Sequence, residues 1–186
     1  MIHKLNMSLP VKYCNLCGSR TRIGVPDGDN RERHICQTCG HIQYQNPKVV
    51  AGSIITHEDQ ILLCKRAIEP RSGYWTIPAG FLENHETIQQ GSIRETWEEA
   101  RAGITDMHLF QITNLTRIGQ IYIIYRSVLA DPFTFAPGPE SLIVELFDED
   151  RIPWDAMAFR VIKTSLRRFL EERTADAFTM LVDTLE

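Results

Sequence analysis

The chain has 186 residues, of which 43% are hydrophobic and 24% are charged, and its formal net charge at pH 7 is −4. This composition predicts an ordinary buried core, and the length supports one domain with a small appendage. No apolar run approaches the roughly 20 residues that cross a bilayer, and residues 1–10 lack the apolar stretch of a signal peptide. We therefore expect a cytoplasmic protein with no membrane partner.

Charge is distributed unevenly along the chain. Residues 1–48 carry seven Lys or Arg and three Asp or Glu, a net charge of about +4, and the remainder carries thirteen and twenty-one, about −8. The acidic part would repel a polyanion such as DNA unless cations intervene, so nucleic acid is not an expected partner. The basic end can contact phosphates or its acidic neighbour, or it can be ordinary solvated charge.

Two cysteine pairs lie near the N-terminus: Cys14 with Cys17 and, after eighteen intervening residues, Cys36 with Cys39. Four thiolates at this spacing predict a structural zinc site, because they complete a tetrahedron around one Zn²⁺. Zinc binding would fold a segment, residues 1–46, that is too short to build its own core. Disulfides are the alternative, which a cytoplasmic location disfavours.

The remainder of the chain predicts a mixed α/β domain. Runs rich in β-branched and aromatic residues predict strands at 49–56, 61–67, 107–114, 118–130 and 141–147. Apolar residues at helical spacing predict a long amphipathic helix within 156–173. Because strands and helices alternate without a regular βαβ rhythm, we expect an α/β/α sandwich with a mixed sheet over 47–173, and a C-terminal tail, 174–186, without a predicted element.

Residues 80–100, GFLENHETIQQGSIRETWEEA, combine many carboxylates with a helical pattern. A helix from about 87 to 101 would place Ile93, Trp97 and Ala100 on one face, which we expect to be buried. A second face would carry three carboxylates, those of Glu95, Glu98 and Glu99. Like charges at these spacings destabilise a helix by about 0.2–0.5 kcal/mol per pair, which a bound divalent cation would offset. The alternative is a solvated acidic face.

This stretch resembles the Nudix box, a pattern written Gx5Ex7REUxEExGU in which U is a bulky apolar residue. The matching residues are Gly80, Glu86, Arg94, Glu95, Glu98 and Glu99. Thr96 occupies the first apolar position, and Arg101 stands where the second glycine belongs. Since that glycine usually makes a left-handed turn at the end of the helix, we expect Gly103 to provide the turn instead.

The resemblance extends from about residue 13 to about residue 170, because a four-cysteine ribbon precedes the Nudix box. The chain looks like the ribbon-bearing ADP-ribose and FAD pyrophosphatases, which implies a Nudix α/β/α sandwich after a small zinc ribbon. NADH pyrophosphatases rank lower, because the SQPWPFP motif expected of them is not found in MHLFQITNLTRIGQIYIIYR. Homodimerisation is an expectation from the family alone.

The resemblance implies hydrolysis of a pyrophosphate in a nucleoside diphosphate linked to another moiety, with Mg²⁺ or Mn²⁺ as the catalytic cation. Glu95, Glu98 and Glu99 are the expected metal ligands. Arg94 is expected to orient their carboxylates, although an ordinary ion pair with Glu98 is the simpler alternative. Glu86 is expected at the entrance of the helix or at a second metal.

Further site residues are predicted outside the box. Glu140 is the candidate general base, because a loop can carry its carboxylate to the metal site, and Glu145 is its nearest rival. Candidate substrate-binding residues are Arg66 and Arg117 for the phosphates and Phe81 and Tyr122 for stacking on a base, and each has an equally good packing or surface explanation. A rival function is a nucleic-acid or protein docking module in which the ribbon binds and the Nudix part is a degenerate scaffold.

Overall fold

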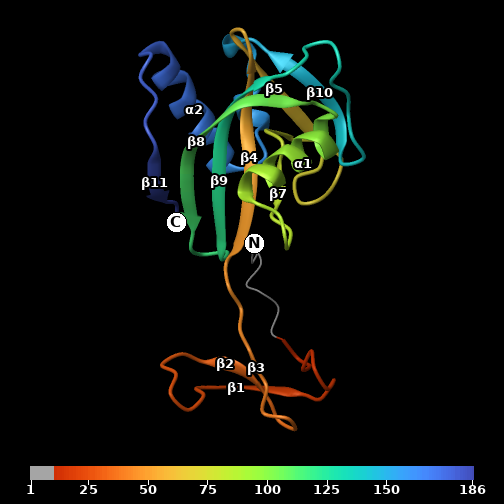
Figure 1. Ribbon diagram of the computed structural model, residues 1–186, viewed down its shortest axis with the longest axis vertical. Helices are drawn as coiled ribbons and strands as arrows, with labels where there is room; N and C mark the ends of the chain where they lie inside the picture. Colours follow the sequence, from red (N-terminus) through yellow and green to blue (C-terminus); the bar gives the residue numbers. More distant parts are fainter. Residues whose placement is uncertain (1–10) are drawn as a thin grey trace. The chain divides into compact units, whose positions relative to one another are not determined.

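The computed structural model describes residues 11–186, so residues 1–10 of the predicted ribbon lie outside the described residues. The chain divides into two compact units, one ending at Pro47 and one running from Lys48 to Glu186 (Figure 1). In the part that the structure describes, no helix is long and apolar enough to span a membrane.

The first unit is built on a small antiparallel sheet of three strands in the order β1-β2-β3. The strands are β1 (Thr21–Gly24), β2 (Arg33–Cys36) and β3 (Ile42–Gln43). One cysteine pair precedes β1 and the other lies at the turn from β2 to β3. Gly18 and Gly40, which directly follow the two pairs, both have a φ of 72°, so glycine supplies the left-handed backbone that closes each turn.

The second unit contains one mixed sheet with the strand order β10-β5-β4-β9-β8-β11. Its strands are β4 (Lys48–His57), β5 (Gln60–Arg66), β8 (Ile104–Leu115), β9 (Gln120–Leu129), β10 (Ser141–Phe147) and β11 (Leu181–Thr184). Strands β4 and β9 run parallel, as do β8 and β11, and the other neighbours are antiparallel. Two short strands, β6 (Trp75–Thr76) and β7 (Ala79–Phe81), pair with β5 and β4.

Two helices cover opposite faces of this sheet, as Figure 1 shows: α1 (Ile88–Ala100) and α2 (Arg160–Thr174). Alternation along the strands divides the core between the two faces. Ile54 packs in the cluster that contains the buried side of α2, whereas the neighbouring Ile55 packs in the cluster that contains Ala100 of α1. The α/β/α sandwich with a mixed sheet is therefore confirmed. Two 3₁₀ turns, Glu149–Arg151 and Trp154–Ala156, precede α2.

The C-terminal segment, for which the sequence predicts no element, joins the sheet. Strand β11 pairs in parallel with β8, with Leu181 opposite Gln111. Phe178 stacks on Phe169 of α2 with the ring centroids 5.4 Å apart. Propensity and periodicity cannot identify a strand of four residues, because long-range pairing with β8 decides its conformation.

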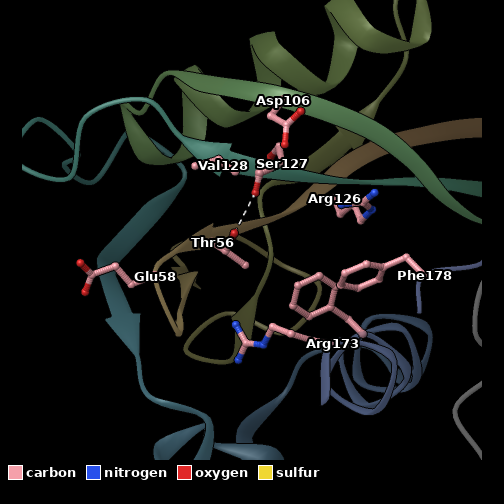
Figure 2. Close-up of a pocket in the computed structure, with 9 residues that line it drawn as sticks. Thr56, Glu58, Asp106, Arg126, Ser127, Val128, Arg173 and Phe178 are labelled. Carbon is pink, nitrogen blue, oxygen red and sulfur yellow. Dashed lines mark hydrogen bonds between the residues drawn. The ribbon is translucent and has the colours of Figure 1, made fainter. Parts of the chain in front are cut away.

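A pocket of about 140 Å³ opens between the sheet and the C-terminal end of α2 (Figure 2). Arg126 and Arg173 line it, and their guanidinium groups lie 4.4 Å from the ring centroid of Phe178 and 5.4 Å from that of Phe169, respectively. None of the predicted site residues lines this pocket.

Candidate metal and active sites

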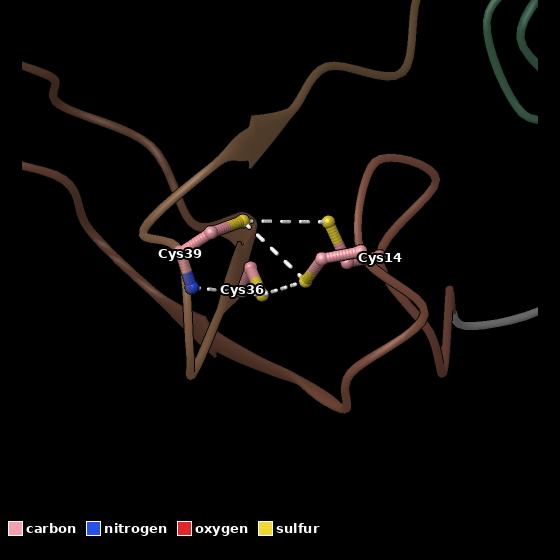
Figure 3. A group of neighbouring side chains, drawn as sticks. Cys14, Cys36 and Cys39 are labelled. Carbon is pink, nitrogen blue, oxygen red and sulfur yellow. Dashed lines mark hydrogen bonds between the residues drawn. The ribbon is translucent and has the colours of Figure 1, made fainter.

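The four ribbon cysteines converge on one point, and their ligand atoms all lie within 4.8 Å of one another (Figure 3). The sulfur of Cys39 lies 3.8 Å from that of Cys14 and 3.6 Å from that of Cys17, and Cys17 and Cys36 are 3.4 Å apart. A disulfide would need a distance of about 2.05 Å, so the cysteines are unbridged.

This arrangement fits zinc. Zn–S bonds of about 2.3 Å in a tetrahedron require S···S separations of about 3.8 Å, close to those observed. Backbone N–H groups of Leu16, Thr38 and Cys39 donate to the sulfurs of Cys14 and Cys36 at 3.4 Å, which stabilises thiolate charge. The predicted four-cysteine zinc site is confirmed as a metal-binding cluster.

Helix α1 begins at Ile88, directly after the capping residue Thr87. The hydroxyl of Thr87 accepts the N–H of Gln90, and the Gln90 side chain accepts the N–H of Thr87, which together form a capping box. The helix ends at Arg101, which itself adopts the left-handed conformation with a φ of 50°. The expectation that Gly103 makes this turn was wrong. The chain must reverse at once because Ala102, the next residue, is buried in the core.

The buried face of α1 also differs from the prediction. Ile93 and Trp97 are 45% and 55% exposed, whereas Ser92, Thr96 and Glu99 are buried. The helix packs against β4 and β7, and a β-carbon added to Gly52 of β4 would lie 2.4 Å from that of Ala79 in β7. The helix itself lies close to β7, since a β-carbon on Gly80 would lie 2.3 Å from the carboxylate of Glu95. The helix face against these strands holds small side chains and one glutamate.

Gly91 and Ser92 both lie in closely packed surroundings at the start of α1. A β-carbon at Gly91 would lie 2.7 Å from a methyl group of Leu82 and 3.0 Å from a carboxylate oxygen of Glu86. The Ser92 hydroxyl is buried without a hydrogen-bond partner, and its carbonyl accepts the Thr96 hydroxyl at 2.8 Å. Thr96 can therefore occupy a buried position where the Nudix box has an apolar residue, because its hydroxyl is hydrogen-bonded within the helix.

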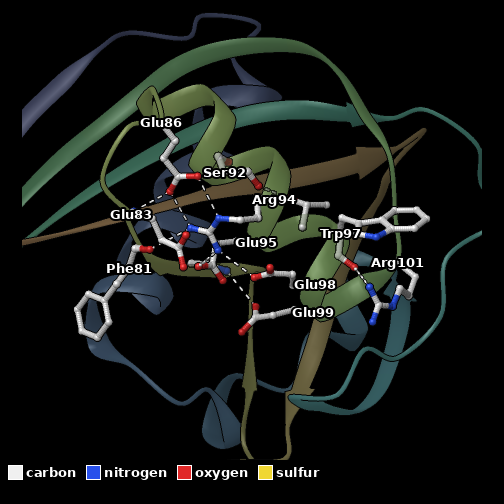
Figure 4. Close-up of polar contacts among 12 residues, drawn as sticks. Phe81, Glu83, Glu86, Ser92, Arg94, Glu95, Trp97, Glu98, Glu99 and Arg101 are labelled. Carbon is white, nitrogen blue, oxygen red and sulfur yellow. Dashed lines mark hydrogen bonds and ion pairs between the residues drawn. The ribbon is translucent and has the colours of Figure 1, made fainter.

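Arg94 connects the carboxylates of the box, as Figure 4 shows. Its Nη1 donates to Glu95 at 2.8 Å and to Glu98 at 2.9 Å, and its Nε and Nη2 donate to Glu86 at 3.0 and 2.7 Å. The Nη2 group also donates to the carbonyl of Phe81 at 3.1 Å. Arg94 thus makes the simple ion pair with Glu98 and, in addition, orients two further carboxylates.

Glu86 lies at the entrance of α1. It accepts the N–H of Glu83 at 2.7 Å in addition to the two Arg94 bonds. Hydrogen bonding from Arg94, followed by that from Glu83, lowers the pKa of Glu86 to about 2. This carboxylate therefore fastens the preceding loop to the helix.

Glu99 is the buried carboxylate of the site. It is only 5% exposed, and its Oε2 accepts the N–H of Ala79 at 3.0 Å. Burial raises the pKa of Glu99 to about 8 and also raises the pKa of Glu95. Gly80 makes room for Glu95, since a β-carbon there would lie 2.3 Å from its carboxylate. Burial therefore disfavours the ionised form of both carboxylates unless a positive charge compensates, and carboxylate oxygens are the donors that Mg²⁺ and Mn²⁺ prefer.

Two of the three carboxylates of α1, those of Glu95 and Glu98, converge on Arg94, whereas Glu99 accepts the N–H of Ala79. Among residues 11–186, the four cysteines are the only group of three or more His, Cys, Asp or Glu side chains whose ligand atoms gather closely enough to hold a metal ion. Carboxylate oxygens are suitable ligands for a divalent cation. That Glu95, Glu98 and Glu99 bind one stays a prediction.

Two candidates outside the box lie close enough to act on its charges. Glu140 raises the pKa of both Glu95 and Glu99, although burial is the main cause, and Arg66 lowers the pKa of Glu99. The Nε of Arg66 donates to the Pro70 carbonyl at 3.0 Å. Backbone hydrogen bonds place this region near the C-terminal end of α1: the N–H of Gly138 donates to the Glu99 carbonyl at 3.0 Å, and the N–H of Ala67 donates to the Glu140 carbonyl at 2.8 Å.

The other candidates have different surroundings. Phe81 is 48% exposed, with the ammonium group of Lys48 lying 5.0 Å from its ring centroid. Tyr122 is buried in the core, Glu145 is paired with Leu63 in the sheet, and Arg117 lies in the turn between β8 and β9. Within the described residues, Arg117 makes no hydrogen bond or ion pair with the site. Their predicted roles remain untested.

Sequence reasoning missed Lys48 beside Phe81, and it missed the Ala79 N–H that holds Glu99. Lys48 reaches Phe81 because β4 pairs with β7, which places Val50 opposite Phe81. No spacing rule connects these residues. The only local signal was the short segment 75–81, whose glycine and proline allow only short extended pieces.

Two family models match consecutive parts of the chain. Residues 12–45 match the family described as Nudix N-terminal, a zinc ribbon, and residues 46–163 match the NUDIX domain. The chain therefore belongs to the Nudix hydrolase family, which confirms the resemblance read from the Nudix box and the cysteines.

A solved NUDIX hydrolase from Nitrosomonas europaea is similar over nearly the whole chain. It is 46% identical, the alignment covers 94% of this chain and 98% of that one, and the TM-score is 0.89. The shared fold therefore includes the ribbon as well as the sandwich.

Curated relatives match over shorter stretches. An NAD-capped RNA hydrolase NudC from Haemophilus influenzae is 32% identical over 104 residues, 53% of this chain and 37% of that protein. An ADP-ribose pyrophosphatase from Methanocaldococcus jannaschii is 39% identical over 56 residues, 30% of this chain and 33% of that protein. The chain thus spans little more than a third of the length of the curated relatives it matches.

Proposed function

We propose that the protein hydrolyses the pyrophosphate of a nucleoside diphosphate linked to a second moiety, using Mg²⁺ or Mn²⁺. The observation that carries the proposal is the buried carboxylate of Glu99, held by the Ala79 N–H beside the carboxylates of Glu95 and Glu98. Keeping a carboxylate ionised in this environment requires a compensating positive charge, and a divalent cation supplies it.

The roles of the residues follow from their positions. Glu95, Glu98 and Glu99 hold the cation, and Arg94 sets the orientation of Glu95 and Glu98 through its Nη1 group. When bound, the cation neutralises charge on the phosphates and lowers the pKa of a bound water. Glu86 acts on the helix entrance rather than as a ligand, since Arg94 and the Glu83 N–H already engage its carboxylate.

Glu140 is the group that we assign as general base. It is exposed, lies on the connection between β9 and β10, and acts electrostatically on two of the proposed ligands. A loop carboxylate in this position can take a proton from the attacking water while the helix carboxylates hold the metal. Glu145 is the weaker choice, because its backbone is fixed in the sheet opposite Leu63.

An NAD-linked compound is the substrate that the relatives favour, since several curated relatives are named as NAD-capped RNA hydrolases. This order differs from that expected from the sequence, which placed ADP-ribose and FAD before NADH. ADP-ribose remains the second candidate because one relative is named as an ADP-ribose pyrophosphatase. We propose nucleic acid only as part of a substrate, in an NAD-capped RNA. Catalysis is therefore the first proposal, and the docking module is the second.

The test is an assay of product identity. Full-length protein with Mg²⁺ or Mn²⁺ is incubated with NADH, NAD-capped RNA, ADP-ribose and FAD, and release of AMP, or of monophosphorylated RNA from the capped substrate, shows cleavage within the pyrophosphate. Glu98→Gln is expected to lose activity by about 100-fold or more, whereas the matched change Glu171→Gln on the exposed side of α2 leaves it unchanged. Equal activity of both variants would reject the ligand assignment, and no cleavage of any substrate by the wild type would reject the enzyme.

A further inference from the structure

The connection between β9 and β10 is hydrogen-bonded to the C-terminal end of α1. The N–H of Ala136 donates to the carbonyl of Ala100 at 2.8 Å, and the N–H of Gly138 donates to the carbonyl of Glu99 at 3.0 Å. The last carbonyls of a helix lack partners within the helix, so an outside donor must satisfy them when they are buried. The connection supplies two such donors.

Gly138 has no room for a side chain. A β-carbon on this residue would lie 1.6 Å from the carbonyl oxygen of Glu98 and 2.7 Å from its carbonyl carbon. These are backbone atoms of a helix and cannot move aside as the end of a side chain can. The φ of Gly138 is not in the left-handed region, so the position requires glycine for space rather than for backbone freedom. The connection can therefore lie against α1 only because residue 138 is glycine.

Glu140 follows Gly138 by two residues and is held on both sides. The carbonyl of Gly138 accepts the N–H of Ser141 at 3.1 Å, which closes a tight turn around Glu140. The carbonyl of Glu140 accepts the N–H of Ala67 at 2.8 Å, directly after Arg66. The backbone of Glu140 is thus fixed between the metal-binding helix and the end of β5, although its side chain is exposed.

We propose that Gly138 is a positioning residue: its contact with the Glu98 carbonyl sets the distance between Glu140 and the carboxylates of α1. This inference rests on the proposed function and deepens it, because it makes the base and the metal ligands parts of one rigid unit. Gly138 does not touch the substrate and acts through Glu140. A side chain at residue 138 must move the connection outward, which carries Glu140 away from Glu95 and Glu99.

The kinetic test compares two glycine substitutions. Gly138→Ala is expected to lower kcat by about 10–100-fold while KM changes by less than about threefold, since a displacement of about 1 Å can cost that much in a catalytic step. Gly103→Ala is the matched control, because a β-carbon there meets only Ala130, at an ordinary 3.4 Å, and its kcat stays at the wild-type level. If Gly138→Ala keeps the wild-type kcat, the proposal is overturned.

A double variant separates positioning from general damage. If Gly138 acts through Glu140, then Gly138→Ala combined with Glu140→Gln is no slower than Glu140→Gln alone, because the base is already lost. Losses that multiply would show that Gly138 acts by another route and would overturn the proposal. A second variant, Ala136→Pro, removes one of the two N–H donors, and the ring Cδ of proline takes the place of that hydrogen against the carbonyl of Ala100. Residue 136 already precedes Pro137, which favours an extended backbone at this position. Ala136→Pro is also expected to lower kcat, and an unchanged kcat would count against a role for these two hydrogen bonds.

A measurement that needs no substrate distinguishes failure of this inference from failure of the proposed function. Amide hydrogen exchange should show protected N–H groups at Ala136 and Gly138 in the wild type, and loss of that protection in Gly138→Ala while the amides of α1 stay protected. Exchange at these amides that is already fast in the wild type would overturn the fastening whatever the activity. A wild-type protein with protected amides and no hydrolysis would instead overturn the proposed function, and the positioning role with it.

Discussion

Arg94 and Glu86 lie eight residues apart and form a two-pronged ion pair, with Nε and Nη2 of the arginine 3.0 and 2.7 Å from the two carboxylate oxygens. This pair closes the loop before α1 onto the second turn of the helix. It also leaves Nη1 free to orient Glu95 and Glu98. The same side chain therefore contributes to the stability of the helix entrance and to the geometry of the proposed metal site.

The Glu86–Arg94 pair predicts a specific dependence of stability on acid. The pKa of Glu86 is depressed to about 2 in the folded state, mainly by hydrogen bonding from Arg94, whereas an unfolded glutamate titrates near 4.3. Because a depressed pKa stabilises the folded state only while the group is ionised, this contribution is present above about pH 4.3 and is lost as the pH falls toward 2. Glu86→Gln should therefore lower the free energy of unfolding most at pH 6, and the difference from wild type should shrink at pH 3.

Urea unfolding of both proteins at a series of pH values measures this difference. Glu171→Gln serves as the control, since the Glu171 side chain makes no ion pair in the described part of the chain. A difference between wild type and Glu86→Gln that stays constant from pH 6 to pH 3 would contradict the assignment.

Gly80 should matter for activity more than for stability. A β-carbon at this position would lie 2.3 Å from the carboxylate of Glu95, which is the movable end of a side chain. Gly80→Ala should therefore fold, with a change in the free energy of unfolding below about 1 kcal/mol, but should displace Glu95 and lower kcat by about tenfold or more. Thermal unfolding and steady-state kinetics on the same preparation test this. A stable variant with normal kcat would show that Gly80 is not needed to position Glu95.

The cysteine cluster predicts about one zinc ion per chain by elemental analysis. Replacing both Cys14 and Cys36 with serine should abolish zinc binding, because it removes two of the four thiolates of the tetrahedron. Cys64→Ser is the control: this cysteine is buried in the sandwich and lies outside the cluster, so the zinc content should stay at the wild-type value. Wild-type protein that folds fully without zinc would contradict a structural role for the metal.

Two tryptophans test the corrected packing face of α1. Trp75 is 9% exposed and packs edge-on against Phe147 with the ring centroids 4.8 Å apart, whereas Trp97 is 55% exposed. Trp75→Ala should cost about 3–5 kcal/mol of stability and Trp97→Ala less than about 1 kcal/mol. Comparable losses in the two variants would restore the original expectation that Trp97 is part of the core.

The errors made from the sequence share one physical origin. Periodicity correctly placed α1, α2 and the long strands, because alternation of apolar and polar residues is a local property. It failed for the face of α1, where Ile93 and Trp97 are exposed, because the packing of α1 on β4 and β7 decides which side of the helix faces the core. It also failed at Gly103, because burial of Ala102 forces the turn two residues earlier than glycine preference suggests.

By itself, the sequence determined which chemistry the protein carries: four thiolates spaced for zinc, and a helix whose glutamates and arginine recur at the spacing of the Nudix box. Both depend on side-chain identity and short-range spacing, which the chain encodes directly. Only the tertiary structure decided where these groups act. Three features arise where segments distant in sequence come into contact: the burial that raises the pKa of Glu99, the space that Gly80 leaves for Glu95, and the hydrogen bond from Gly138 to α1. No local pattern specifies such contacts.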